Sequence, residues 1–112
     1  MGTIEAVALP DGQLVVSAHG PLDERIAGTL RDALVPLTGA SRPLVLDLND
    51  AHGLDDAVLA VVGRAAELVR LQQGTRMGIV SRSASIRSLV HDYGLDDDVV
   101  LYDTLKDALN ID

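Results

Sequence analysis

Short apolar runs alternate with segments whose apolar residues recur at helical spacing, and this alternation constrains the fold more than any other feature of the sequence. The clearest run is Leu44–Leu48, which is short and almost wholly apolar, as expected of a buried central strand. The predicted element order is β-β-α-β-α-β-α-β-α. Since crossovers between parallel strands are right-handed, this order predicts an α/β fold, with a mainly parallel sheet of about five strands and about four helices.

The first two strands form a predicted hairpin, because residues 3–9 and 13–18 flank the turn signal Pro10-Asp11-Gly12. Gly20 and Pro21 then break the strand pattern, and residues 49–53 predict a polar loop. The longest helix has a wide apolar arc, so we expect it to be well buried. The other predicted elements are strands at 44–48, 77–80 and 99–102, a helix from Asp23–Glu24 to about Pro36, a helix from Asp55 or Asp56 to Gly74, a helix capped by Ser83 or Ser85 that stops at Gly94, and a helix at 104–109.

The composition excludes several classes of function. A chain of 112 residues is the size of one domain, so we expect a single domain over residues 1–112. The absence of Cys excludes thiol catalysis and thiolate metal sites, and the net charge of -8 argues against nucleic-acid binding and against anionic membrane surfaces. No apolar stretch reaches the roughly 20 residues of a membrane span. We therefore expect a cytoplasmic protein with no membrane insertion and no cofactor.

Catalytic and metal-binding motifs have little support. His19, His52 and His91 occur without a nucleophile motif, and no phosphate-binding glycine motif is present. His52 lies near several Asp residues in the sequence, but these have no fixed ligand spacing. An enzyme or a metal protein therefore remains only an alternative, and we expect no metal site.

Several local strings resemble the STAS domain, the family of bacterial anti-sigma factor antagonists, from about residue 3 to residue 109. No single string is specific, but their order and spacing match the family along nearly the whole chain. The matching strings are Gly20-Pro21-Leu22-Asp23, Leu30-Arg31-Asp32-Ala33-Leu34, Leu44-Val45-Leu46-Asp47-Leu48, Leu54-Asp55-Asp56-Ala57-Val58-Leu59, and Ser83 to Gly94 followed by Leu95-Asp96.

This resemblance implies a protein-binding function. Family members bind an anti-sigma factor, often a serine kinase, so that a sigma factor is released. Phosphorylation of the second Ser in a loop of the form Leu-Asp-Ser-Ser-Gly-Leu ends the contact. Here Asp56 replaces the first Ser, Ala57 the phosphoaccepting Ser, and Val58 the Gly. No Ser, Thr or Tyr occurs from residue 42 to residue 74, so conventional phosphorylation of this loop is excluded by chemistry.

The predicted partner-binding surface centres on Asp23, on the loop from Asp50 to Ala57, and on the exposed side of the helix that begins at Asp55 or Asp56. Asp56 supplies a permanent carboxylate that mimics part of a phosphate, or the domain binds without a switch here, or the site has decayed and another surface binds. Asp55 or Asp56 can also cap the helix, and Val58 either packs in the core or blocks a kinase. An alternative function is a STAS regulatory subunit of a lipid or anion transport system. The predicted contacts are Asp23, Asp50, Asp55, Asp56, Ala57 and Val58, and their charge predicts a basic or hydrogen-bond-donating partner surface.

Overall fold

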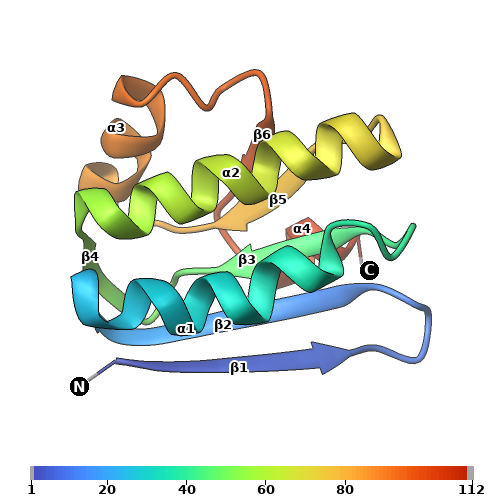
Figure 1. The fold of residues 1–112 in the computed structure, drawn as a ribbon, viewed down its shortest axis with the longest axis horizontal. Helices are drawn as coiled ribbons and strands as arrows, with labels where there is room; N and C mark the ends of the chain where they lie inside the picture. The colour runs from blue at the N-terminus through green and yellow to red at the C-terminus, as the bar shows by residue number, and fades with distance from the viewer. Residues whose placement is uncertain (1, 111–112) are drawn as a thin grey trace.

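The computed structural model describes residues 2–110 and has six strands and four α-helices within them. The helices lie against a sheet whose strand order is β1-β2-β3-β5-β6, and β4 pairs with β2 off this path (Figure 1). The strands are β1 (Thr3–Ala8), β2 (Leu14–Leu22), β3 (Leu44–Asp47), β4 (Ala51–Leu54), β5 (Met77–Val80) and β6 (Val99–Tyr102). The α-helices are α1 (Glu24–Leu34), α2 (Asp56–Gln73), α3 (Ala84–Asp92) and α4 (Leu105–Leu109), and a 3-10 turn spans Val35–Leu37.

The sheet is mainly parallel, as the element order predicts. β1 and β2 form the expected antiparallel hairpin, and the other pairings, β2–β3, β2–β4, β3–β5 and β5–β6, are parallel. In Figure 1, α1 and α2 run side by side across one face of the sheet, and both begin at the end of the molecule where β4 lies. The starts of these two helices are therefore neighbours in space although they are distant in sequence.

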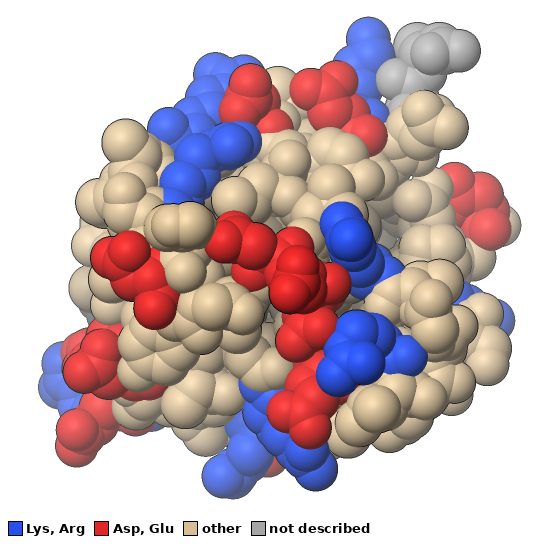
Figure 2. Space-filling model, turned by 90° about the horizontal axis from the view of Figure 1, so that it is seen from above, with Lys and Arg blue, Asp and Glu red and all other residues tan. Residues whose placement is uncertain are grey.

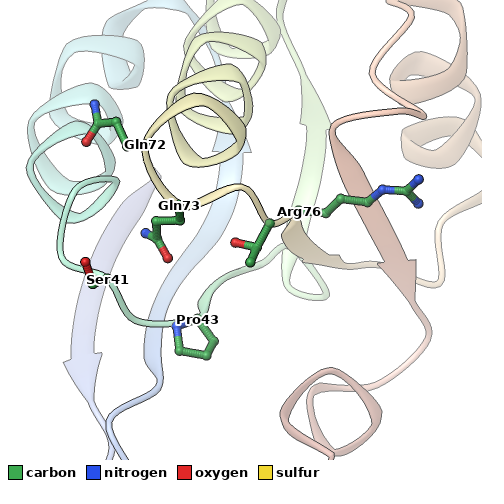
Figure 3. Close-up of a pocket in the computed structure, with 6 residues that line it drawn as sticks. Ser41, Pro43, Gln72, Gln73 and Arg76 are labelled. Atoms are coloured by element: carbon green, nitrogen blue, oxygen red, sulfur yellow. The ribbon is translucent and has the colours of Figure 1, made fainter.

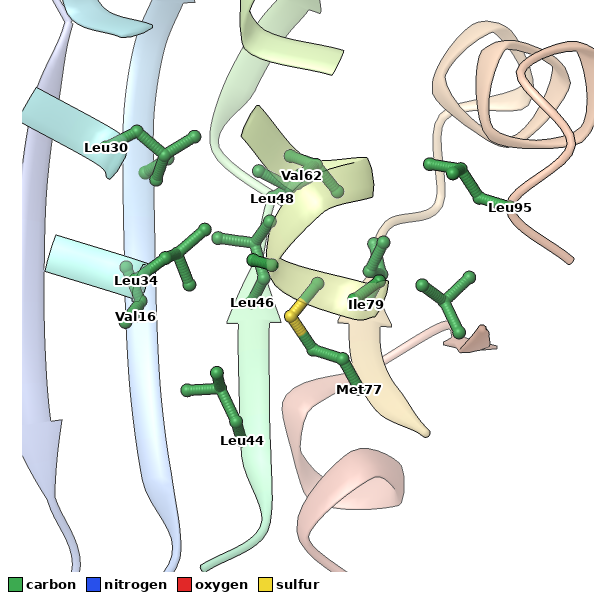
Figure 4. Packing of buried hydrophobic residues seen from close by; sticks show 14 of the residues in the cluster. Val16, Leu30, Leu34, Leu44, Leu46, Leu48, Val62, Met77, Ile79 and Leu95 are labelled. Carbon is green, nitrogen blue, oxygen red and sulfur yellow. The ribbon is translucent and has the colours of Figure 1, made fainter. Parts of the chain in front are cut away.

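The core is aliphatic and lies mostly between the sheet and the helices α1, α2 and α3. Alternate strand residues such as Val16, Leu46 and Ile79 point into it and are fully buried (Figure 4). The other face of the sheet carries a smaller cluster around Val15, Val45, Val80 and Leu109, to which α4 contributes. A chain without Phe or Trp thus fills both layers with branched side chains.

One prediction about the strands was wrong. Residues 49–53 do not form only a polar loop, because β4 begins at Ala51 and adds a sixth strand beside the five on the main path of the sheet. It pairs with the end of β2, which continues through Gly20 and Pro21 instead of stopping before them. The register shifts between Gly20 and Leu22, and Gly20 has a φ of +79°. This irregularity accommodates a glycine and a proline inside a strand.

The helix boundaries follow local signals. The hydroxyl oxygen of Ser83 accepts a hydrogen bond from the Ile86 amide and caps α3, as predicted. Pro36 lies in the 3-10 turn directly after α1, and Gly74 ends α2 in the left-handed conformation that glycine favours. None of the helices in residues 2–110 is both long enough and apolar enough to cross a membrane.

The longest helix is less completely covered than its apolar arc predicts. One side of α2 is buried against the sheet and its neighbouring helices, but Leu71 is 62% exposed and Val61 and Leu68 are only half-buried. The helices form a single layer on this face of the sheet, so no element of the described chain packs over the outer side of α2 (Figure 1). The buried residues of the helix are Val58, Leu59, Val62, Ala65, Ala66 and Val69.

Candidate partner-binding surface

Asp23 caps the start of α1 directly after β2 ends. Its carboxylate accepts a hydrogen bond of 3.0 Å from the backbone amide of Arg25, and bonds of 2.9 and 3.3 Å from the Arg25 guanidinium. These bonds, led by the one from the guanidinium, hold the pKa of Asp23 below its ordinary value. Asp23 thus presents an oriented, ionised carboxylate. Arg25 was not singled out in the sequence, although its position two residues after a predicted cap was a usable signal.

Asp55 occupies the matching position at the start of α2. β4 pairs with β2 through Leu22 and Leu54, and the Asp55 amide donates a 3.0 Å hydrogen bond to the Leu22 carbonyl. Asp55 is the N-cap residue of α2, as one of the two predicted candidates, but the side-chain hydrogen bond expected of a capping Asp is absent. The backbone carbonyl of Asp55 accepts from the amides of Val58 and Leu59, and its carboxylate forms no capping bond.

The two helix starts border one shallow hollow. A cavity of about 300 Å³ is lined by Asp23 and Asp55 together with residues from the end of β2 and from β4. Asp56 is exposed next to Asp55, at the first position of α2. We refer to Asp23, Asp55 and Asp56 as the acidic corner. The remaining residues that line the hollow are Pro21, Leu22, His52, Gly53 and Leu54.

The acidic corner carries its charge at two helix N-termini. The partial positive charge of a helix N-terminus interacts favourably with nearby carboxylates. The carboxylates of Asp55 and Asp56 have no hydrogen-bond donor among residues 2–110, whereas Asp23 is paired with Arg25. Two of the three carboxylates are therefore open to a donor from another molecule.

The other predicted contact residues differ in how far they can reach a partner. Asp50 accepts from His19 at 3.1 Å and lies outside the hollow, although it is highly exposed. Ala57 is half-buried in the first turn of α2. Val58 is completely buried in the main core, so its side chain can neither touch a partner nor shield the loop from a kinase. The expected contact by Val58 is thereby corrected, because its branched side chain fills core space.

No catalytic or metal-binding cluster is assembled around the His residues that the structure describes. His19 pairs with Asp50, and His91 pairs with Asp96 at 2.6 Å, and neither pair includes a nucleophile. His52 lines the hollow beside Asp55, but no group of three His, Asp or Glu residues within 2–110 is arranged to hold a metal ion.

A larger cavity, of about 410 Å³, lies at the opposite end of α2 (Figure 3). Gln73 points toward it and donates a 2.7 Å hydrogen bond to the Thr38 carbonyl, which ties α2 to the turn after α1. The Arg76 side chain extends away from the cavity. The amide of Gln73 is thus engaged within the chain.

The net negative charge is not spread evenly over the molecule. On the face that Figure 2 shows, acidic side chains form a band with Lys and Arg on both sides of it. Ion pairs such as Arg70–Asp98 at 2.6 Å and Arg87–Asp103 at 2.5 Å join opposite charges across neighbouring elements. The acidic corner differs, because its only ion pair within the described chain is Asp23–Arg25.

Comparison with known families decides the identity of the fold. The family model of the STAS domain matches residues 4–108, which is nearly the whole chain. The chain belongs to the STAS domain family. The resemblance seen in the sequence strings is therefore confirmed.

Curated STAS relatives are named for sigma-factor regulation. The anti-sigma-F factor antagonist RsfB of Mycobacterium tuberculosis is 32% identical over 105 residues, which cover 92% of this chain and 84% of RsfB. The anti-sigma-F factor antagonist RsfA of the same species is 27% identical over 103 residues, which cover 89% of this chain and 80% of RsfA. Both alignments span almost all of the STAS domain.

A solved STAS structure agrees with the fold in detail. The crystal structure of an anti-sigma factor antagonist from Mycobacterium paratuberculosis superposes with a TM-score of 0.83 at 32% identity, covering 98% of this chain and 92% of that one. The mainly parallel sheet, the N-terminal hairpin and the four helices are thus the architecture of this STAS domain.

Proposed function

We propose that this STAS domain is an anti-sigma factor antagonist that acts in the cytoplasm by protein contact and performs no catalysis. The observation that carries the proposal is the 32% identity to the anti-sigma-F factor antagonist RsfB over 92% of the chain. The relatives reported above are named for action on anti-sigma factors and none of them for transport, so a role in a transport system gains no support from them.

The partner proposed is an anti-sigma factor, of the serine-kinase type that the family resemblance implies. It would bind the acidic corner together with the exposed surface around Asp50 and Ala57. The open carboxylates of Asp55 and Asp56 favour a partner that brings Arg or Lys side chains or backbone amides to this end of the molecule. Opposite charges on the two surfaces would speed association, and added salt would slow it.

In this proposal the contact is not switched by phosphorylation at the start of α2. The position that matches the family's phosphoacceptor is Ala57, and no hydroxyl-bearing residue lies between residues 42 and 74. Asp56 brings one negative charge to the helix start, whereas a phosphate would bring about -1.5 to -2. A single exposed carboxylate offers a partner a stable point of contact. We therefore expect the chain to remain competent to bind at all times.

The test measures binding and phosphorylation separately. An anti-sigma factor encoded beside this gene would be titrated with the wild-type protein by calorimetry, and the measurement would be repeated with Asp55→Asn/Asp56→Asn. Loss of two charge-assisted contacts predicts that affinity falls by about tenfold or more. The matched control is Asp11→Asn/Asp107→Asn, which removes two exposed carboxylates away from the acidic corner and should leave affinity nearly unchanged.

Phosphorylation is tested with the same partner and ATP. No phosphate is expected within residues 42–74 of the wild type by mass spectrometry, and ATP should not weaken its binding over time. Asp56→Ser/Ala57→Ser restores two hydroxyls and leaves the buried Val58 in place. If the wild type does not bind the anti-sigma factor at micromolar concentration, the proposed function is wrong. Phosphate on the wild-type segment 42–74 would contradict the unswitched loop.

A further inference from the structure

A second candidate surface lies between α1 and α2. An open cavity of about 370 Å³ lies between the two helices, on the side away from the sheet. Most of its lining is apolar, and the only charged groups of the described chain that line it are two guanidinium groups. The lining residues are Arg31, Val35, Ala60, Val61, Arg64 and Leu68, and we call them the α1–α2 groove.

The groove belongs to a longer stripe along the outer side of α2. Residues 57, 60, 61, 64, 68 and 71 follow one another at helical spacing, and all but Arg64 are apolar. Leu71 is 62% exposed, and Val61 and Leu68 are half-buried. A surface of this kind costs free energy in water unless it is covered, and its helical spacing suits an amphipathic helix laid along it.

The charge of the groove is opposite to that of the acidic corner. Arg31 and Arg64 line it in a chain whose net charge is -8, and no acidic residue within 2–110 lines it. Their ion pairs are long and exposed: Arg31–Asp32 spans 3.5 Å and Arg64–Glu67 spans 3.3 Å. Exposed pairs of this kind contribute little, so both guanidinium groups can exchange their intramolecular partner for a carboxylate on another protein.

The acidic corner alone is too small to form a stable interface, so a partner must also contact a neighbouring surface. A specific complex buries about 800 Å² on each partner and involves roughly 20–30 residues on each side. The acidic corner and its hollow supply far fewer residues, and their charge is typical of an interface rim rather than of its apolar centre. Ala57, in the first turn of α2, adjoins the acidic corner and begins the stripe, so the two surfaces are continuous.

We infer that the α1–α2 groove binds an amphipathic helix of the anti-sigma factor, with its apolar side on Val61 and Leu68 and its carboxylates at Arg31 and Arg64. This inference rests on the proposed function, because it extends the same interface along the helices. The partner surface is then expected to have a basic region and an acidic region side by side. Basic groups meet the acidic corner, and an acidic amphipathic helix follows along α2.

The experiment uses the full chain and the same anti-sigma factor as the test of the proposed function. Arg31→Glu/Arg64→Glu should bind at least about tenfold more weakly than wild type, because it removes two attractions and adds two repulsions. Arg42→Glu/Arg76→Glu is the matched control: it changes the net charge equally at exposed arginines that do not line the groove, and it should bind within about twofold of wild type. Thermal unfolding verifies that each variant is folded.

A second pair of variants separates the effect of an added charge on binding from the effect of an added side-chain volume. Ala60 is exposed and lines the groove, so Ala60→Glu and Ala60→Lys introduce long side chains with little risk to folding. The groove predicts that Ala60→Glu binds more weakly than Ala60→Lys. A partner that senses only the acidic corner predicts the reverse order, since an added Lys weakens the attraction of a basic surface.

The outcomes distinguish the two proposals. If the wild type does not bind the anti-sigma factor, both are wrong. If Asp55→Asn/Asp56→Asn weakens binding but both groove tests leave it within about twofold, only the groove is wrong. Binding by Ala60→Glu that equals or exceeds binding by Ala60→Lys would likewise overturn the groove and leave the acidic corner standing.

Discussion

Val58→Gly should be strongly destabilising, although it restores the residue that the family pattern has at this position. The Val58 side chain is completely buried in the main core. Truncation to Ala removes two buried methyl groups and leaves a cavity, which costs about 2–3 kcal/mol. Replacing Ala by Gly in a helix costs about 1 kcal/mol more. The free energy of unfolding should therefore fall by about 3–4 kcal/mol.

Urea denaturation followed by circular dichroism measures this loss, and Ala60→Gly is the matched control. Ala60 lies two residues further along the same helix and is exposed, so its replacement by Gly should cost only the backbone contribution of about 1 kcal/mol. The difference between the two variants, about 2–3 kcal/mol, isolates the buried side chain. Equal losses for the two variants would refute the burial of Val58, and with it the reason for keeping this valine in the Asp56→Ser/Ala57→Ser variant.

Two further predictions concern the geometry of the corner. Because the folded-state pKa of Asp23 is lowered, its carboxylate stabilises the fold above the ordinary Asp pKa of about 3.9, and this contribution is lost as pH falls through the lower folded value. Asp23→Asn should therefore flatten the fall in melting temperature between about pH 5 and pH 2. An unchanged dependence of melting temperature on pH in this range would contradict the prediction. Gly53 has a φ of +117°, so Gly53→Ala should lower the free energy of unfolding by about 1–3 kcal/mol in urea titrations, and a neutral result would show that β4 relaxes.

Much of the fold could be predicted because several elements carry a complete local signal. The apolar runs of β3 and β5 lie between helical segments, and the hydroxyl of Ser83 marks the start of α3. Each of these signals needs only neighbouring residues to be recognised. The predicted order of elements was therefore confirmed, apart from the added β4, and with it the mainly parallel sheet.

β4 could not be predicted because its evidence is not local. Its four residues, Ala51–Leu54, are half-buried or exposed and include a His and a Gly, so they lack an apolar pattern. They form a strand because the end of β2 supplies the pairing, through a stretch whose Gly20 and Pro21 look like strand breakers. The irregular register between Gly20 and Leu22 allows the end of β2 to pair with β4 although it contains a glycine and a proline.

Only part of the candidate site could be predicted, because the rest depends on how distant elements pack together. Asp23 and Asp55 were named from the family strings, and the structure brings both to one hollow. The exposed side of α2 was predicted as part of the contact surface, but the groove that it forms with α1 was not, because the apolar spacing of α2 covers more than one side of the helix. Only the arrangement of the layers decides which side stays open, as it does at Leu71.

The pairing of β4 with the end of β2 sets how far apart the two helix starts are held. Leu22 pairs with Leu54, the Asp55 amide donates to the Leu22 carbonyl, and Asp23 and Asp55 are the next residues on their respective segments. The separation of their backbones is thus set by the strand pairing and does not depend on side-chain rotamers. The two helix starts therefore form one rigid unit, and a molecule that contacts both meets them at a spacing set by the sheet.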